Sequence, residues 1–264
     1  MKTLYIDCGM GAAGDMLMAA LLELTDNKDE TVKALNGLGI PTVRYSYEDS
    51  TKCGIKGTHM VVKVDGVEED EHMHEHCHEH HDYEHCHEHH DHEHHHEHHS
   101  MHDIEHIVSH INVSDKVKKD ILAVYNLIAE AESDAHGCPI SEIHFHEVGT
   151  MDAIADVTAV CYLMDKLGIE RTIASPVHVG SGTVKCAHGI LPVPAPATAY
   201  ILRNVPIYGG EIKGELCTPT GAALLKHFVS EFGNMPIMTT ERIGYGMGKK
   251  DFERANCVRV MLGV

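Results

Sequence analysis

Residues 68–99 are the part of this chain that most restricts what it can fold into. The segment holds sixteen histidines and twelve Asp or Glu residues, with no Lys or Arg. It has no apolar periodicity, so it cannot bury enough side-chain surface to offset the entropy of ordering its backbone. We therefore expect an insertion that is disordered without metal, and a single globular domain made of residues 1–67 and 100–264.

The histidines of the insertion are spaced for chelation. Imidazole suits nickel, zinc, copper and cobalt, and the affinity order alone does not select nickel among them. Alternate residues place several rings on one side of an extended chain, and a spacing of four pairs rings on a helical turn. Such a flexible tract suits metal storage and delivery, because it neither fixes a geometry nor excludes water. The predicted ligands are His72, His74, His76, His78, His80, His94 and His98.

Two other interpretations of the insertion stay open. Histidine titrates near neutral pH, so a solvated loop of this composition is also compatible with pH sensing. A low-complexity tract with only adventitious metal affinity has the same composition.

The rest of the chain alternates short β-type runs with stretches of helical periodicity. This alternation predicts an α/β class, with a mixed α+β fold as the other possibility. A proline-rich tract at residues 186–198 predicts either a rigid strand that is buried or lines a site, or a stiff connector. The predicted strands are Thr3–Asp7, Val43–Glu48, Thr58–Val64 and Cys257–Leu262, and the predicted helices are residues 16–24, Asp29–Leu38, Ser114–Ala135, Thr150–Leu167, Ala195–Arg203 and Thr220–Phe232.

Composition excludes several classes of protein. Twelve of the nineteen net negative charges lie in the insertion, and the remainder is mildly acidic without a basic stripe, unlike nucleic-acid-binding proteins. The chain has no run of about 18 apolar residues that would span a membrane, and its first residues lack the apolar stretch of a signal peptide. Nine scattered cysteines are typical of free thiols in a reducing compartment. We expect a soluble cytoplasmic protein that binds neither nucleic acid nor membranes.

A second group of possible metal ligands lies between residues 144 and 156. His144 and His146 face the same way in an extended segment, and Asp152 and Asp156 share a face of the following helix. With Glu147, they can hold one divalent ion and leave positions open for a substrate. The alternative is structural: Asp152 then favours the N-terminus of its helix, and the histidines are ordinary polar groups at a strand edge.

Two loops have the character of phosphate-binding sites. Gly9, Gly11 and Gly14 follow a strand and precede a helix, which exposes backbone N–H groups to an anion. The next segment is helical rather than a strand, so a dinucleotide-binding fold is not expected. Asp15 would repel a phosphate unless a cation lay between them. In the second loop, Thr218 and Thr220 either cap a helix or bind an anion.

Cysteines flank these loops at Cys8, Cys186 and Cys217. Each is a possible soft metal ligand, but an inert buried thiol is the ordinary role of such a cysteine.

The order of these motifs resembles the LarC family. The segments that carry the resemblance are GAAGDMLMAALLEL, the His-rich insertion, HFHEVGTMDAIAD, SPVHVGSGTVKCAHGILPVPAPAT, GELCTPTGAALL and GYGMG. The resemblance implies a cytoplasmic protein that binds Ni(II) and inserts it into pyridinium-3,5-bisthiocarboxylic acid mononucleotide, forming nickel–carbon and nickel–sulfur bonds. It also implies consumption of CTP with Mg or Mn, and service to a downstream apo-enzyme of the lactate racemase type.

The resemblance also implies a missing partner. Family members continue beyond the strand ANCVRVMLG into a C-terminal domain associated with CTP binding, and some are encoded as two frames joined by ribosomal frameshifting. We therefore expect this chain to need a separate or frameshift-joined C-terminal polypeptide for nickel insertion. The interpretation leaves open whether the chain forms a homo-oligomer.

These considerations assign roles to particular residues. The nickel ligands at the transfer site are expected to be His144, His146, Glu147, Asp152 and Asp156. The substrate phosphate or a nucleotide is expected at Gly11, Gly14, Asp15, Thr218 and Thr220, and the base that removes the ring proton at His146 or His188, on residue type alone. Two alternatives remain: a non-catalytic nickel store or metallochaperone, and a metal-dependent hydrolase that uses the same ligands.

Overall fold

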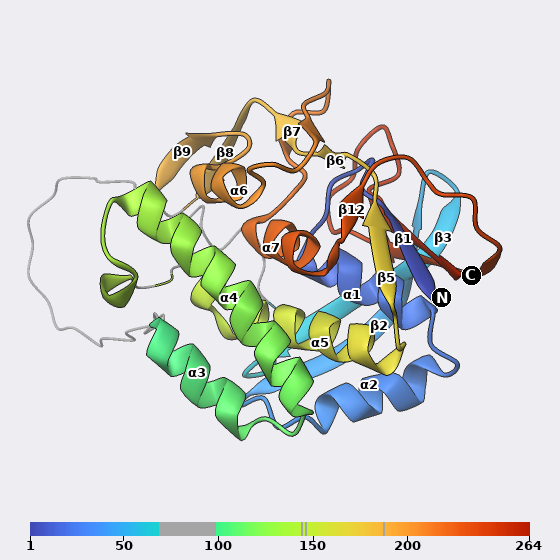
Figure 1. The fold of residues 1–264 in the computed structure, drawn as a ribbon, viewed down its shortest axis with the longest axis horizontal. Coiled ribbons are helices and arrows are strands. Elements are labelled where there is room, and N and C mark those ends of the chain that lie inside the picture. The colour runs from blue at the N-terminus through green and yellow to red at the C-terminus, as the bar shows by residue number, and fades with distance from the viewer. Residues whose placement is uncertain (69–98, 144, 146, 187) are drawn as a thin grey trace, which may run out of the picture.

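The computed structural model describes residues 1–68, 99–143, 145, 147–186 and 188–264 (Figure 1). The predicted disorder of the insertion and its seven predicted ligands therefore lie outside the described residues. None of the described helices is both long enough and apolar enough to cross a membrane.

Helices make up much of the described chain, and most begin where the sequence predicts. Ser114 caps α4 by accepting a hydrogen bond from the Val117 backbone N–H at 3.3 Å, and Thr150 caps α5 in the same way. A helix near residue 100 is not predicted from the sequence, yet Ser100 and Asp103 form a capping box there. The helices are α1 (Gly14–Glu23), α2 (Lys28–Asn36), α3 (Met101–His110), α4 (Asp115–His136), α5 (Met151–Lys166), α6 (Pro196–Ile201) and α7 (Pro219–Phe228), with 3-10 turns at Ile140–Glu142 and Glu147–Gly149.

The main sheet is mixed, which confirms the α/β class in its mixed form. Its strand order is β12-β5-β1-β14-β13-β3-β2, with β4 paired to β3. The pairs β12/β5, β5/β1 and β13/β3 are parallel, and the others are antiparallel. The strands are β1 (Thr3–Asp7), β2 (Val43–Lys52), β3 (Ile55–Val64), β4 (Val67–Glu68), β5 (Arg171–Ala174), β12 (Glu231–Phe232), β13 (Thr240–Met247) and β14 (Cys257–Gly263).

The predicted helix over Thr220–Phe232 is wrong at its C-terminal end. α7 stops at Phe228, and Glu231–Phe232 instead forms β12 beside β5. The Ser230 backbone N–H donates to the Thr172 carbonyl oxygen at 2.9 Å, and Arg171 pairs with Glu231 at 2.6 Å. Pairing with a distant strand thus overrides local helical propensity.

Six short strands form three separate pairs at one end of the molecule. They are β6 (Val177–His178) with β10 (Ile207–Tyr208), β7 (Gly180–Ser181) with β11 (Gly214–Glu215), and β8 (Thr183–Cys186) with β9 (Gly189–Pro192). The strand predicted in the proline-rich tract is present as β9, which pairs with β8, but it is not buried: Ile190 is 73% exposed. The buried alternative is therefore wrong.

Helices cover the sheet in layers (Figure 1). α1 packs on β3, β13 and β14, α5 packs on α1, and α4 packs on α5, α6 and α7. Alternate residues of β1 divide between the faces: Leu4 and Ile6 join the main core under the helices, whereas Tyr5 packs with Ile173 and Met261 on the other face.

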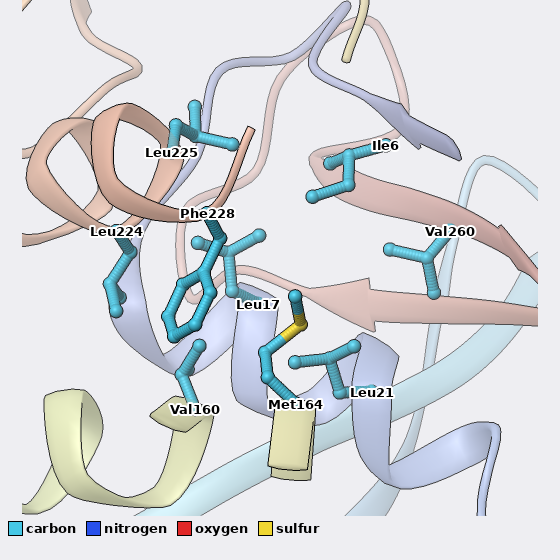
Figure 2. Close-up of a pocket in the computed structure, with 9 residues that line it drawn as sticks. All are labelled: Ile6, Leu17, Leu21, Val160, Met164, Leu224, Leu225, Phe228 and Val260. Atoms are coloured by element: carbon cyan, nitrogen blue, oxygen red, sulfur yellow. The ribbon is translucent and has the colours of Figure 1, made fainter. Parts of the chain in front are cut away.

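An apolar cavity lies where α1, α5 and α7 meet β1 and β14 (Figure 2). No polar side chain lines it, so it has nothing with which to orient a charged mononucleotide. It belongs to the core, and its lining residues are Ile6, Leu17, Leu21, Val160, Met164, Leu224, Leu225, Phe228 and Val260.

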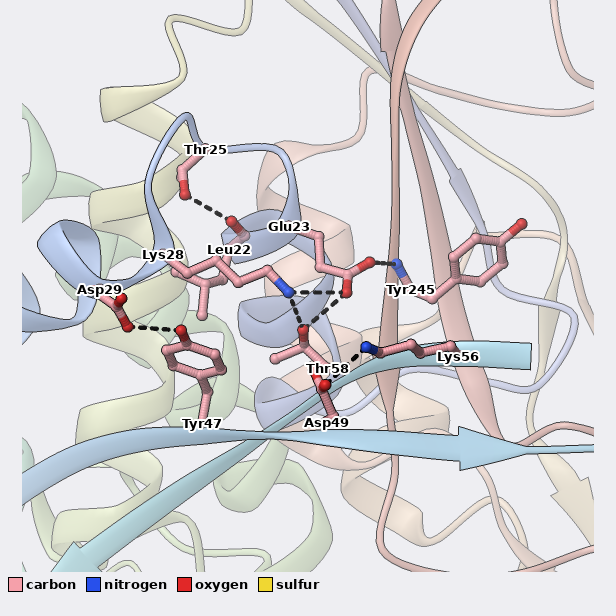
Figure 3. Close-up of polar contacts among 10 residues, drawn as sticks. All are labelled: Leu22, Glu23, Thr25, Lys28, Asp29, Tyr47, Asp49, Lys56, Thr58 and Tyr245. Carbon is pink, nitrogen blue, oxygen red and sulfur yellow. Dashed lines mark hydrogen bonds and ion pairs between the residues drawn. The ribbon is translucent and has the colours of Figure 1, made fainter. Parts of the chain in front are cut away.

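A polar cluster anchors the C-terminal end of α1 (Figure 3). The Glu23 carboxylate accepts hydrogen bonds from the Thr58 hydroxyl at 2.8 Å, the Lys28 ammonium at 3.2 Å and the Tyr245 backbone N–H at 2.7 Å. Because the carboxylate has three donors, this cluster is a structural clamp between α1, β3 and β13. The candidate functional site lies at the opposite, N-terminal end of α1.

Candidate functional site

The loop between β1 and α1 lies against residues 216–218, which are some two hundred positions away in the sequence. The Ala12 backbone N–H donates to the Leu216 carbonyl oxygen at 3.0 Å, and the Thr218 N–H donates to the Ala12 carbonyl oxygen at 3.1 Å. Gly11 has φ +79°, and a Cβ there would lie 1.9 Å from the Leu216 carbonyl oxygen. Glycine is therefore required at position 11 for both conformation and space. The structure brings together the two loops that the sequence suggests for phosphate binding.

The N-terminus of α7 is fitted closely to this loop. The Thr218 hydroxyl caps α7 by accepting a hydrogen bond from the Gly221 N–H at 3.2 Å, and it lies 3.0 Å from the Thr220 hydroxyl. A Cβ on Gly221 would lie 2.2 Å from the Ala12 carbonyl oxygen. Of the two roles suggested for Thr218, helix capping is thus present, and anion binding stays a prediction.

Asp156 is the buried acid of this region. It lies in the second turn of α5, is 7% exposed, and packs against the start of α1. A Cβ on Gly14 would come within 2.5 Å of Asp156 Oδ2, so the glycine makes room for the carboxyl group. The main chain of Asp15 at the start of α1 favours the ionised form of the Asp156 carboxyl group. Asp156 Oδ1 is buried and has no hydrogen-bond partner among the described residues.

The electrostatic surroundings of Asp156 oppose its ionisation. Burial, followed by the charges of Asp152 and Asp15, raises the pKa of Asp156 well above its usual range, while Lys249 and the Asp15 main chain act in the opposite direction. We call Asp15, Asp152 and Asp156 the acidic junction. A cation bound there would offset the repulsion and favour the ionised form.

Lys249 is a basic residue that interacts electrostatically with the acidic junction. It forms an ion pair with Glu68 at 3.0 Å. Burial lowers the pKa of Lys249, but the hydrogen bond and charge of Glu68, together with Asp152 and Asp15, more than offset this and raise it. Sequence reasoning missed Lys249, and its position directly after the GYGMG motif was the available signal.

Comparison with known proteins agrees with these motifs. A family model described as "Nickel insertion protein" matches residues 4–264. The chain belongs to this family. The resemblance to LarC proteins inferred from the loop motifs is thereby confirmed.

Relatives in the family carry a more specific name. The chain is 43% identical over 264 residues to the pyridinium-3,5-bisthiocarboxylic acid mononucleotide nickel insertion protein of Clostridium kluyveri, covering 100% of this chain and 62% of the relative. It is 44% identical over 273 residues to the protein of that name from Clostridium acetobutylicum, covering 100% of this chain and 64% of the relative. For the Desulfitobacterium hafniense (strain DCB-2) protein the values are 38% over 263 residues, 100% and 58%. The chain thus spans about three-fifths of the length of these relatives, and no solved structure matches it.

The structure describes only part of the nickel-ligand set expected in this family member. Asp152 and Asp156 lie one turn apart on α5, as predicted. His144 and His146 lie outside the described residues, and Glu147 opens a 3-10 turn. Among the residues that are described, no group of three or more His, Cys, Asp or Glu side chains is arranged to hold a metal ion. The carboxylates alone therefore do not form a complete nickel site, and the histidine ligands stay a prediction.

His188, the second predicted base, lies on other elements. It sits in the turn between β8 and β9, with its ring centroid 4.8 Å from that of His136 at the end of α4. His136 Nε2 in turn lies 3.3 Å from a Glu132 carboxylate oxygen. His188 therefore belongs to a histidine pair outside the acidic junction, and its role as a base stays a prediction.

The cysteines beside the loops differ in exposure. Cys8 and Cys217 are buried, and burial, followed by nearby charges, raises the pKa of both thiols. A raised pKa keeps sulfur protonated at neutral pH, and metals bind the thiolate. These two cysteines thus fit the inert buried role, whereas Cys186 is partly exposed on β8.

Proposed function

We propose that this chain binds nickel and takes part in inserting it into pyridinium-3,5-bisthiocarboxylic acid mononucleotide. The observation that carries the proposal is Asp156, a buried carboxyl group whose Oδ1 has no hydrogen-bond partner among the described residues and whose ionisation is opposed by the charges of Asp152 and Asp15. Burying an acid in this way costs stability unless a cation arrives. In a member of the nickel insertion family, the cation of interest is the nickel ion in transit.

The proposed division of labour follows the position of each group. Residues 68–99 collect Ni(II), and Asp152 and Asp156 receive it together with His144, His146 and Glu147. Gly11, Gly14, Thr218 and Thr220 hold the phosphate of the mononucleotide near two helix N-termini, where backbone N–H groups favour an anion. Asp15 is better suited to the metal side of the site than to the phosphate, since its carboxylate belongs to the acidic junction.

Formation of the nickel–carbon bond requires a base. The pyridinium ring loses one proton as the nickel–carbon bond forms, and His146 or His188 is proposed to accept it. Consumption of CTP with Mg or Mn, completion of the site by a C-terminal polypeptide, delivery to a lactate racemase-type enzyme and a cytoplasmic location are further parts of this proposal. The relatives named above contain residues outside the matched region, and the proposed C-terminal polypeptide would correspond to that part of them.

Nickel titration of matched variants tests the acidic junction. Residues 69–98 are replaced by a Gly/Ser linker of equal length, which retains Glu68 for Lys249 and His99, whose Nδ1 lies 2.8 Å from the Gly149 carbonyl oxygen. We expect calorimetry to find one remaining nickel site in this variant. Adding Asp156→Asn should weaken that site at least about tenfold, because one charged ligand is lost. Asp165→Asn is the matched control, since Asp165 lies on the same helix but pairs with Lys116 at 2.9 Å.

Loss of all nickel binding with the linker replacement would instead identify a nickel store whose folded part holds no metal. Reconstitution then tests insertion itself. The chain is mixed with the apo-cofactor, nickel and CTP, with and without the C-terminal polypeptide of a relative. We expect mature cofactor only when both polypeptides are present, and efficient conversion by this chain alone would contradict the required partner.

A further inference from the structure

Tyr208 forms an aromatic stack with a buried histidine at the carboxyl end of β1. Tyr208 and His178 are register partners on the parallel strands β10 and β6, with ring centroids 4.7 Å apart and planes at 5°. The His178 backbone N–H donates to the Cys8 carbonyl oxygen at 3.2 Å. The stack therefore lies beside the loop that follows β1 and leads to Gly11 and the acidic junction.

His178 is held rigidly beneath the tyrosine. It is 1% exposed, and its Nδ1 lies 3.1 Å from the Gly9 carbonyl oxygen. A carbonyl oxygen only accepts, so Nδ1–H is the donor of this hydrogen bond. Nε2 is buried with no hydrogen-bond partner among the described residues, and a Cβ on Gly210 would lie 2.4 Å from it. Because it is enclosed on these sides, the imidazole supports one face of the Tyr208 ring in a fixed position.

The outer side of Tyr208 is open. The residue is 43% exposed, although one face of its ring is covered by the imidazole. Three other tyrosines of the described chain have a cation over the ring: Arg203 over Tyr200 at 3.5 Å, Lys28 over Tyr47 at 5.6 Å and Lys166 over Tyr162 at 5.9 Å. No lysine or arginine in the described ranges lies over Tyr208 in this way. Its exposed face is thus available to a cation from outside the chain.

The surroundings of Tyr208 keep its ring uncharged. Burial, followed by Asp7 and Cys8, raises the pKa of Tyr208, and Arg254 opposes this more weakly. Asp7 itself forms an ion pair with Arg259 at 2.6 Å. A raised pKa keeps the phenol neutral at physiological pH, which preserves the ring face for stacking. The electron-rich face of an aromatic ring attracts a cation, and a flat cation adds stacking contact.

We propose that the open face of Tyr208 binds the flat, positively charged ring of an N-substituted pyridinium mononucleotide. This inference rests on the proposed function and deepens it, because it gives the ring of the substrate a place beside the loop that is proposed to hold its phosphate. Tyr208 then acts as a specificity-determining residue that separates a pyridinium from the neutral ring of a cytidine nucleotide.

Two mononucleotides that share the same ribose phosphate and differ by one hydride on the ring, and hence in ring charge and aromaticity, provide the test. Oxidised nicotinamide mononucleotide has a flat cationic ring, and its reduced form has a neutral ring on the same ribose phosphate. We expect calorimetry on the full chain to give about tenfold tighter binding of the oxidised form. Tyr208→Phe should keep this preference, and Tyr208→Leu should abolish it by weakening the oxidised form about tenfold. Tyr200→Leu is the matched control and should change neither affinity, because Arg203 already covers that ring.

The outcomes separate this inference from the proposed function. Equal binding of the two redox forms by the unaltered chain, or unchanged binding by a Tyr208→Leu variant with an unaltered melting temperature, would overturn the inference. Equally tight binding of cytidine monophosphate would overturn it as well. Nickel titration of the same samples reports on the acidic junction independently, so a failure of the Tyr208 platform and a failure of nickel binding are distinguishable.

Discussion

The same three helices build two contrasting regions of this molecule. Midway along α1, α5 and α7, side chains such as Leu17, Val160 and Leu224 line an apolar cavity without any polar group (Figure 2). At the N-terminal ends of α1 and α7 and the second turn of α5, the contacts are made instead by Gly14, Asp156 and the residues of the Thr218 cap.

The two regions contribute differently to the stability of the fold. The apolar cavity is lined by apolar side chains alone, so its residues are exchangeable for others of similar volume. Within the acidic junction, Asp156 departs from the rule that buried acids are paired, because its Oδ1 has no hydrogen-bond partner among the described residues, and its close approach to α1 depends on Gly14. Local rules are broken in this way at functional sites, where selection for a ligand outweighs stability.

Truncation in the apolar cavity should give the largest effect. Leu17 is 2% exposed, and Leu17→Ala removes buried methyl groups and enlarges an existing void. We expect a loss of about 2–5 kcal/mol in the free energy of unfolding, measured by urea denaturation. Nickel affinity at temperatures where the variant is folded should not change. A loss below about 1 kcal/mol would mean that the cavity collapses around the smaller side chain.

Local sequence signals account for the helices but not for their partners. α4 and α5 are predictable because Ser114 and Thr150 precede long apolar periodicities. β5 and β13 escape prediction because their identity as strands depends on pairing with β1, β14 and other distant segments rather than on alternation.

The candidate site is predictable as a set of residues but not as a geometry. Asp152 and Asp156 follow from a spacing of four on a helix, and Thr218 follows from its position before a helix. The burial of Asp156 could not be foreseen, because it depends on Gly14 of another helix. The electrostatic interaction of Asp15 with Asp156 also depends on that contact.

Neutralising the buried acid should increase stability in a pH-dependent way. The pKa of Asp156 is raised in the folded chain, so folding takes up a proton at pH values between the unfolded pKa, about 3.9, and the folded value. Stability contributed by this group therefore falls as the pH rises through that window. Asparagine cannot ionise. We expect Asp156→Asn to resemble the unaltered chain at pH 4 and to be about 1–2 kcal/mol more stable at pH 7.

Denaturation curves at several pH values measure this effect. Asp165→Asn, on the same helix, serves as the control, because its surface ion pair with Lys116 is worth at most about 1 kcal/mol and should be lost rather than gained. A variant Asp156→Asn that is less stable than the unaltered chain at pH 7 would show that the carboxylate is already compensated in the folded chain. The acidic junction would then stabilise the folded chain as the rest of the core does.

The helix cap at Thr218 is expected to give the smallest change in the free energy of unfolding. Its effect on mononucleotide binding should be larger than that of the Leu17 substitution. Thr218→Ala removes the acceptor for the Gly221 N–H but leaves the apolar contacts of α7 in place, so the free energy of unfolding should fall by about 1 kcal/mol. Thr220→Ala keeps that cap and should cost less.

If the cap also helps to hold the mononucleotide phosphate, Thr218→Ala should weaken nicotinamide mononucleotide binding severalfold in calorimetry, whereas Leu17→Ala should leave it unchanged. The two regions are then distinguished by opposite rankings: the apolar substitution has the larger effect on unfolding, and the cap substitution has the larger effect on binding. The same ranking for both measurements would mean that ligand affinity merely follows global stability.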